Sequence, residues 1–260
     1  MIYNLDCMDV FKGIENESVD CVVTDCPYHI ISGGCTNDHV KIGRYREMSG
    51  FISHRLDRAK NDIEAEIISN TRQGKIFEYN DIEFSEWLPE VYRVLKQNTH
   101  CYIMVNARNL KDLWSEAESV GFKFQNLLIW DKGNVTPNKY YMGAYEVILM
   151  LRKGSARKIN NKGTTNILRV PNIMRVKLHP TEKPSELMKI LIENSSNEGE
   201  VVLDPFMGSG STGVACKELK REFIGIEIDQ KYYDIAKDRI EKADVSRNEM
   251  EGQVSIFDLV

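Results

Sequence analysis

The stretch from Val201 to Asp229 constrains the fold more than any other part of the chain. An apolar run, 201–203, leads into a turn with three glycines and then into a segment, 214–220, of helical character. A second apolar run, 223–228, ends beside two acids, Glu227 and Asp229. Strand, tight turn, helix and strand in this order are typical of nucleotide-binding α/β units, where the acid meets a ribose hydroxyl. The stretch predicts a cofactor of the adenosine type.

The glycine turn alone leaves the identity of the cofactor open. Gly208, Gly210 and Gly213 have the spacing of the dinucleotide fingerprint. A phosphate-binding P-loop is excluded, because no lysine lies between Gly208 and Gly213. The alternative is a glycine-rich turn that joins a strand to a helix and binds no ligand. The remaining motifs must decide.

The rest of the chain alternates between helical and extended patterns. Apolar spacing predicts helices at 84–95, 110–120, 185–194 and 231–242, and strands at 19–24, 101–105, 124–130 and 145–151. We expect Ser185 to cap one helix and Gly121 to end another. This alternation is typical of an α/β fold with a mostly parallel, doubly wound sheet covered on both faces.

Two segments interrupt the alternation and suggest the domain organisation. Residues 30–75 are polar and predict a long functional loop or a small helical insert, and residues 152–178 are basic and weakly periodic. We expect one catalytic domain, 1–242, with variable insertions near 30–75 and 134–177. A charged tether and an apolar motif follow at 243–260.

Composition places the chain among globular proteins of a reducing compartment. There is no run of 18 apolar residues, and the amino terminus has neither a basic leader nor an apolar signal core, so we expect no membrane partner. The six cysteines form no C-x-x-C pair, which argues against a disulfide framework and predicts no metal site. A cytoplasmic location fits these features.

Charge is distributed unevenly along the chain. The net charge of −5 argues against a nucleic-acid partner, but residues 139–183 carry ten lysines and arginines against two glutamates, a net +8. A basic segment in an acidic protein is a possible nucleic-acid footprint, and a solvated charged surface is the alternative. The candidate DNA contacts are Arg152, Lys153, Arg157, Lys158, Lys162, Arg169 and Arg175.

A second motif, Asp25-Cys26-Pro27-Tyr28, follows the strand predicted at 19–24. Open α/β sheets bind ligands at the carboxyl ends of their strands. Pro27 holds Cys26 in an extended conformation, which leaves the Cys26 carbonyl free to accept a hydrogen bond. A carboxylate and a carbonyl beside the aromatic ring of Tyr28 suit a planar base that carries an amino group. A third motif, H-P-T-E-K-P, spans 179–184.

Taken in chain order, D-C-P-Y, H-P-T-E-K-P and D-P-F-M-G-S-G-S-T-G resemble the amino-group DNA methyltransferases of the beta class, which depend on S-adenosylmethionine. A dinucleotide oxidoreductase would leave the first two motifs unexplained. The resemblance covers nearly the whole chain apart from the two variable segments and the tail. It implies a Rossmann-like methyltransferase fold, S-adenosylmethionine as cofactor and double-stranded DNA as partner.

The resemblance also implies a set of cofactor-binding residues. Glu227 matches the acid for the ribose hydroxyls, and Asp6 the carboxylate beside the adenine. Lys183 would face the methionine carboxylate, with a surface lysine as the alternative. The full set is Asp6, Thr181, Lys183, Asp204, Pro205, Phe206, Gly208, Gly210 and Glu227.

The catalytic residues implied are Asp25, Cys26, Pro27 and Tyr28. Asp25 and the Cys26 carbonyl would accept the hydrogens of the target amino group, and Tyr28 would stack on the extruded base. Cys26 departs from the family, where proline is more frequent, so we expect a small, nearly buried residue without thiol chemistry. An aspartate in the first position favours adenine over cytosine. Cytosine-N4 methylation, an amide or RNA substrate, and a binding module without catalysis remain alternatives.

The tail carries a further short motif. The order Gln253, any residue, Ser255, Ile256, Phe257 resembles the peptide by which bacterial replication and repair proteins dock on the sliding clamp. The alternative is an arm that packs on the protein's own surface or on a second copy in a homodimer.

Overall fold

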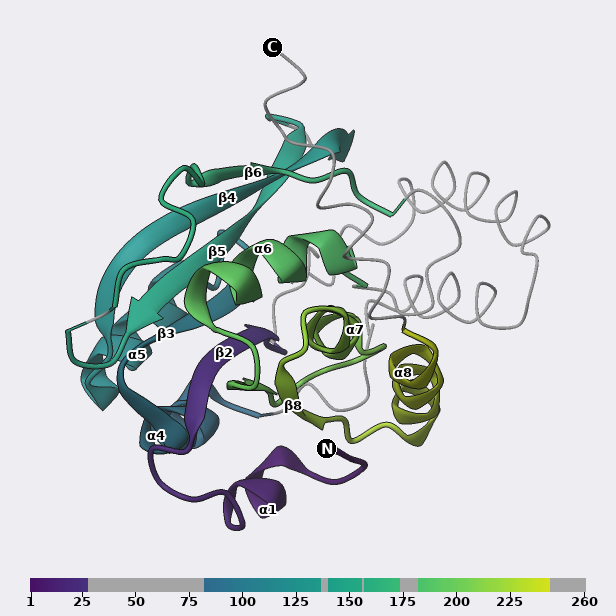
Figure 1. Ribbon diagram of the computed structural model, residues 1–260. Helices are drawn as coiled ribbons and strands as arrows, with labels where there is room; N and C mark the ends of the chain where they lie inside the picture. Colours follow the sequence, from purple (N-terminus) through teal and green to yellow (C-terminus); the bar gives the residue numbers. More distant parts are fainter. Residues whose placement is uncertain (28–81, 137–139, 156, 174–181, 244–260) are drawn as a thin grey trace, which may run out of the picture.

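The computed structural model describes residues 1–27, 82–136, 140–155, 157–173 and 182–243. Within these residues the strands form one eight-stranded sheet in the order β1-β8-β7-β2-β3-β5-β4-β6 (Figure 1). All neighbouring pairs are parallel except those of β5, which is antiparallel to β3 and to β4. The predicted α/β fold with a mostly parallel sheet is confirmed. The strands are β1 (Ile2–Tyr3), β2 (Val19–Asp25), β3 (Leu95–Val105), β4 (Lys123–Thr136), β5 (Gly143–Arg152), β6 (Ile167–Arg169), β7 (Val201–Asp204) and β8 (Glu222–Ile226).

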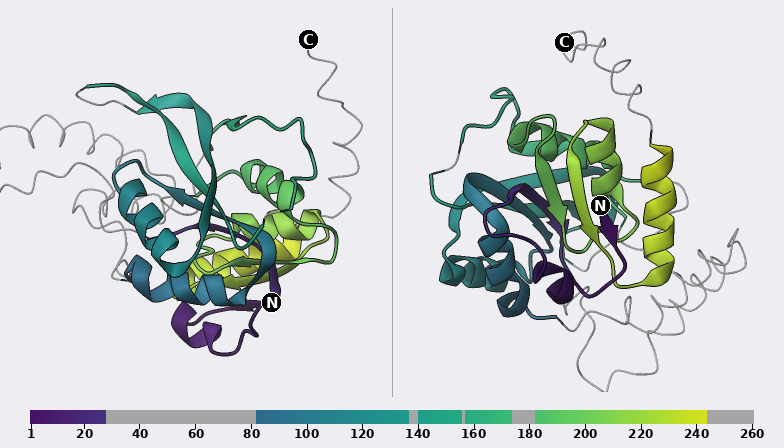
Figure 2. Two further views of the ribbon diagram at one scale, coloured as in Figure 1. Left: turned by 90° about the vertical axis from the view of Figure 1, so that its left-hand side faces the viewer. Right: turned by 60° about the horizontal axis from the view of Figure 1, so that its bottom comes forward.

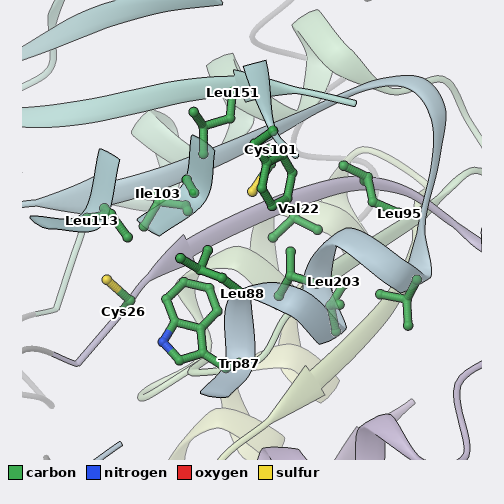
Figure 3. Packing of buried hydrophobic residues seen from close by; sticks show 14 of the residues in the cluster. Val22, Cys26, Trp87, Leu88, Leu95, Cys101, Ile103, Leu113, Leu151 and Leu203 are labelled. Carbon is green, nitrogen blue, oxygen red and sulfur yellow. The ribbon is translucent and has the colours of Figure 1, made fainter. Parts of the chain in front are cut away.

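Helices cover both faces of the sheet (Figures 1 and 2). One face packs on α1 (Cys7–Phe11), α4 (Phe84–Val94) and α5 (Leu110–Val120), and the other on α6 (Ser185–Ser195), α7 (Ser211–Glu218) and α8 (Gln230–Lys242). Side chains alternate along a strand, so the residues of β2 pack in two hydrophobic clusters, one on each face of the sheet. Val22 packs in the first cluster with Trp87 and Leu88 (Figure 3), whereas Cys21 and Val23 pack in the second.

Two helix ends follow local signals, and one expected cap does not form. The Asp6 side chain accepts a hydrogen bond from the Met8 backbone N–H at the start of α1, and Gly121 ends α5 with a φ of 115°. The expectation that Ser185 caps α6 is wrong. Ser185 is the first helical residue, and the cap position belongs to Pro184, whose backbone is extended.

Several strands extend beyond their predicted bounds. Strand β3 begins at Leu95, directly after α4, and β4 and β5 form a long hairpin that continues past the carboxyl end of β3. The interpretation of 152–178 as an interruption of the sheet is corrected, because β6 within it pairs with β4 at the sheet edge. Only Leu168 of its three residues is buried, so this strand leaves no apolar run in the sequence.

Two predicted regions lie outside the described residues. They are the segment 30–75 and the chain beyond Ala243, so the proposed insertion and tether stay predictions. In the described part of the chain, no helix is long and apolar enough to cross a membrane.

Candidate active site

The parallel strands bring acidic residues from distant parts of the sequence to one edge of the sheet. Asp25 is the last residue of β2 and Asp204 the last of β7, and β2 pairs with β7. Glu227 follows β8, the other neighbour of β7, while Asp6 follows β1, the neighbour of β8. Carboxyl ends of strands are the usual ligand-binding edge of an open α/β sheet, and we call this edge the catalytic edge.

Asp204 holds the start of the glycine turn in place. The buried carboxylate accepts hydrogen bonds from the Thr24 hydroxyl (2.8 Å), the Thr212 hydroxyl (2.6 Å) and the Phe206 backbone N–H (3.1 Å). Burial raises the pKa of Asp204 to about 6, although these hydrogen bonds oppose the shift. Because its acceptors are engaged by β2 and α7, Asp204 shapes the turn that a ligand would contact.

The glycines of the turn serve both conformation and packing. Gly208 and Gly210 have φ values of 51° and 82°, which favour glycine. A Cβ on Gly210 would lie 2.9 Å from the Cβ of Ala236 on α8, too close for any other residue. Pro205 is buried, and the Phe206 ring packs edge-on against Trp87 at 5.2 Å between centroids.

Glu227 joins the turn to the following strand. Its carboxylate accepts hydrogen bonds from the backbone N–H groups of Gly208 and Asp229, both at 2.9 Å. Burial raises the pKa of Glu227 to about 7, and the two backbone donors only partly oppose the shift. A carboxyl group poised at this pKa beside a glycine turn suits hydroxyl donors of a ligand.

The residues at this turn fit an adenosine cofactor. The hydroxyl of Ser211, at the start of α7, is buried and has no hydrogen-bond partner among the described residues. A buried hydroxyl without a partner is costly unless a ligand or water completes it. Glu227, the glycine turn and Ser211 are polar groups of the kind that a ribose and its substituents would bind. The sequence analysis missed Ser211, although it stands within the glycine motif.

Asp25 is engaged in a chain of charged side chains. The Lys183 ammonium lies 2.5 Å from Asp25 Oδ2 and 3.4 Å from Glu146 Oε2, and Lys132 lies 3.4 Å from Glu146 Oε1. Lys183 is only 7% exposed, so the surface-lysine alternative is wrong. The sequence analysis missed Glu146, a single acid in the apolar strand β5.

Cys26 is buried at 2% exposure, as expected of a small residue behind Asp25. Its thiol donates a weak hydrogen bond to the Met104 carbonyl, with the sulfur 3.7 Å from the oxygen. Burial raises the pKa of the Cys26 thiol well above its ordinary value, and the negative charge of Asp25 adds to the shift. A thiol in this state is a poor nucleophile.

The structure engages two of the predicted DNA contacts within the fold: Lys153 is buried, which corrects its assignment, and Arg157 is partly buried, with 28% of its side chain exposed. Lys153 is 4% exposed, and its ammonium donates to the carbonyls of Tyr92 and Leu95 at 2.8 Å each. Arg157 forms a two-pronged ion pair with Glu200, at 3.0 and 2.7 Å. Lys153 is therefore not available to a phosphate, whereas Arg157 already pairs with a carboxylate.

The remaining basic residues lie at two different edges of the sheet. Arg152 pairs in register with Lys123, the first residue of β4, which places it at the edge opposite Asp25. Lys158 and Lys162 are exposed. They lie near the end of α6, at that same opposite edge, since the backbone N–H of Asn160 donates a hydrogen bond to the Asn194 carbonyl there. Arg169 differs from them. It ends β6 opposite Asp131, at the catalytic edge, and is largely exposed.

The β4–β5 hairpin projects beyond the catalytic edge (Figure 2, left). Strand β3 ends at Val105, opposite Val147, so the hairpin residues beyond that level have no partner in β3. Large side chains near its turn are strongly exposed, with Tyr140 at 83% and Tyr141 at 91%. Exposed apolar side chains concentrated at one place are typical of a binding surface.

Six predicted site residues lie outside the described part of the chain. Their roles stay predictions, and they are Tyr28, Thr181, Arg175, Gln253, Ile256 and Phe257.

Comparison with known proteins decides the family. The sequence pattern of the N6/N4 methyltransferase family, described as DNA methylase, matches residues 19–238. The chain belongs to this family. The type II methyltransferase M2.DpnII of Streptococcus pneumoniae is 30% identical over 261 residues, which cover 90% of this chain and 87% of that protein. The type II methyltransferase M.HpaI of Haemophilus parainfluenzae is 28% identical over 262 residues, which cover 91% and 72%.

Solved structures agree with this assignment. The M1.HpyAVI complex with S-adenosylmethionine superposes with a TM-score of 0.63 and 26% identity, covering 92% of this chain and 98% of that one. The cytosine-N4-specific PvuII DNA methyltransferase has a TM-score of 0.65 at 16% identity, a likeness of fold alone. The chain is therefore a DNA amino-methyltransferase, and S-adenosylmethionine is its cofactor.

Proposed function

We propose that this DNA methyltransferase acts on the 6-amino group of adenine, in a base turned out of double-stranded DNA. The observation that carries the proposal is the position of Asp25, at the carboxyl end of β2 and next to the cofactor turn that follows β7. The bound cofactor supplies an electrophilic methyl group on its sulfonium. A base inside the duplex cannot reach a sheet edge of this kind, so it must be extruded.

The chain has to make the amino nitrogen a better nucleophile. The nitrogen lone pair is delocalised into the ring, and acceptors that bind both amino hydrogens favour a tetrahedral nitrogen with a directed lone pair. The Asp25 carboxylate and the Cys26 backbone carbonyl are the acceptors that we assign to this task. Tyr28 would stack on the base, and this assignment rests on its place in the sequence motif.

Adenine is favoured over cytosine by one residue. The family resemblance associates aspartate in the position of Asp25 with adenine, whereas cytosine-N4 enzymes commonly carry serine there. Cytosine-N4 methylation is the second candidate, because the chemistry of the amino group is the same in both bases.

Several residues support cofactor binding at the turn. We assign the ribose hydroxyls to Glu227, whose carboxylate lies beside the Gly208 backbone. Asp6, exposed after β1, is assigned to the adenine. The methionine end would reach Lys183 and Thr181, and a carboxylate there would compete with Asp25 for the Lys183 ammonium.

The DNA surface that we propose is the catalytic edge together with the β4–β5 hairpin. Arg169 offers an exposed cation at this edge, and Tyr140 and Tyr141 offer stacking surfaces. Arg152, Lys158 and Lys162 lie at the opposite edge, and we leave them out of this surface together with the buried Lys153 and with Arg157, which pairs with Glu200.

Product analysis tests the proposal. The protein is incubated with methyl-tritiated S-adenosylmethionine and with genomic DNA that lacks adenine methylation, and the DNA is digested to nucleosides. We expect the label in N6-methyl-2′-deoxyadenosine, and we expect no label when the protein carries Asp25→Ala. Label in N4-methylcytosine would refute the adenine assignment. Label in RNA alone would refute the DNA substrate, and binding of DNA without transfer would indicate a module without catalysis.

A further inference from the structure

Glu146 is a partly buried acid, with 33% of its side chain exposed, that the proposed chemistry has not used. It lies on β5, where residues 147–151 are all buried and apolar. Its two carboxylate oxygens face two different ammonium groups, Lys132 on β4 and Lys183 before α6, each at 3.4 Å. Burial raises the pKa of Glu146, but the two lysines outweigh burial and leave it below its ordinary value. Glu146 is therefore an anion in the folded protein.

Lys183 stands between two carboxylates. Its ammonium is 2.5 Å from Asp25 Oδ2 and 3.4 Å from Glu146 Oε2. The ammonium beside Asp25 occupies an oxygen that the target amino group needs. The strength of the Lys183–Asp25 contact therefore limits how well Asp25 can receive the base. Glu146 attracts Lys183 from the other side and weakens that contact.

We propose that Glu146 is a positioning residue, which shares the Lys183 ammonium with Asp25 and so weakens the contact that the target amino group must displace from Asp25 Oδ2. The proposal rests on the function proposed above. During transfer the amino nitrogen bonds to the methyl carbon, the carbon–sulfur bond breaks with its electron pair left on sulfur, and the nitrogen loses one proton through Asp25. Lys183 held by Glu146 leaves Asp25 able to take that proton and pass it to solvent.

A purely structural role is the alternative. Glu146 would then only balance the buried charge of Lys183, and its loss would lower stability without changing how the rate depends on pH. Other charged groups near this cluster are present unchanged in every variant. They are Asp204 on β7, which senses the charge of Asp25, and the Glu182–Arg239 pair (2.9 Å) beside Lys183.

The test uses the full chain with Glu146→Gln, which removes the charge but keeps the shape. Lys132→Met is the matched control, because it removes the other ion pair of Glu146 and leaves the contact with Lys183. Single-turnover methyl transfer to DNA is measured as a function of pH at saturating cofactor and DNA. Cofactor affinity and thermal unfolding are measured on the same samples.

We expect Glu146→Gln to lower the plateau rate about tenfold, the equivalent of one pKa unit of interaction energy. The acidic limb of its pH profile should move to lower pH, because the Lys183 ammonium beside Asp25 is then no longer shared with the Glu146 carboxylate. Lys132→Met should keep the wild-type limb. Glu146→Asp, which retains a carboxylate with a shorter reach, should fall between Glu146→Gln and wild type.

An unchanged rate and limb in folded Glu146→Gln would overturn the proposal, as would the same shift in Lys132→Met. If Glu146→Gln does not fold, Glu146→Asp is the deciding variant. A pH–rate profile of Glu146→Asp whose acidic limb is the same as that of the wild-type protein would refute the positioning role. Failure of the proposed function looks different, because the wild-type protein would then place no label in adenine.

Discussion

Cofactor affinity should depend on pH through Glu227. Burial raises the pKa of this carboxyl group to about 7 in the free protein, against the opposing hydrogen bonds from the Asp229 and Gly208 backbones. A ribose hydroxyl donates to a carboxylate, so binding favours the ionised form of Glu227. Affinity for S-adenosylmethionine should therefore rise as the pH rises through about 7. Between pH 6 and pH 8 the ionised fraction grows from about a tenth to about nine tenths, which gives a roughly tenfold gain in affinity.

Stability should respond to pH with the opposite sign. A carboxyl group whose pKa is raised on folding binds its proton more tightly in the folded state than in the unfolded one. Its contribution to stability is present below the unfolded value, about 4.3, and is lost as the pH rises through about 7. Bound cofactor should offset this loss, so the thermal shift that it causes should be larger at pH 8 than at pH 6.

Isothermal titration calorimetry across this range measures the affinity directly. Glu227→Gln is the control, because it keeps the shape and removes the titrating group. Its affinity should be lower at pH 8 and nearly independent of pH, apart from a residual contribution of Asp204, whose pKa is about 6. A wild-type affinity that stays constant from pH 6 to pH 8, or that falls, would refute the assignment of Glu227 to the ribose.

Three further outcomes are expected. Cys26→Ala should retain most of the methylation activity, because the backbone carbonyl remains and the thiol is buried; complete loss of activity in a folded, cofactor-binding variant would contradict this. Arg169→Gln should reduce the salt dependence of DNA binding by about one unit of slope, whereas Lys158→Gln with Lys162→Gln, at the opposite edge, should not; the reverse result would move the DNA surface. Deleting 253–260 should abolish pull-down by the sliding clamp and leave methylation of a short oligonucleotide intact, while a destabilised truncation with no clamp binding by the full chain would indicate a packing arm.

Much of the fold follows from signals within short stretches of sequence. The cap at Asp6, the left-handed Gly121 and the glycine turn are local, and each was predictable because it depends on one backbone conformation. The direction of β5 did not have such a signal. The predicted strands 124–130 and 145–151 leave fourteen residues between them, enough for a parallel crossover, and only the observed bounds reduce the connection to the six residues 137–142.

The site was predictable only where a motif marks it. Asp25 stands in a recognisable tetrapeptide, but Glu146 gains its meaning from Lys183, a residue of a different element that meets it only in the folded sheet. Charge counting along the chain also fails for a physical reason. The segment that follows β5 places Lys153 and Arg157 at the edge opposite Asp25, where the Lys153 ammonium donates to backbone carbonyls and Arg157 pairs with Glu200.

The central claim is that Asp25 takes part in methyl transfer, and that the neighbouring glycine turn binds the cofactor whether or not Asp25 is present. The most direct test compares wild type with Asp25→Asn, which keeps the size of the side chain and removes its charge. Single-turnover transfer of the tritiated methyl group to DNA is followed at saturating cofactor, with cofactor affinity measured in parallel. We predict that transfer falls by about 10²–10³-fold, the loss typical of removing one preorganised polar contact to a reacting group, while cofactor affinity changes little. Transfer at a rate close to wild type would contradict the account.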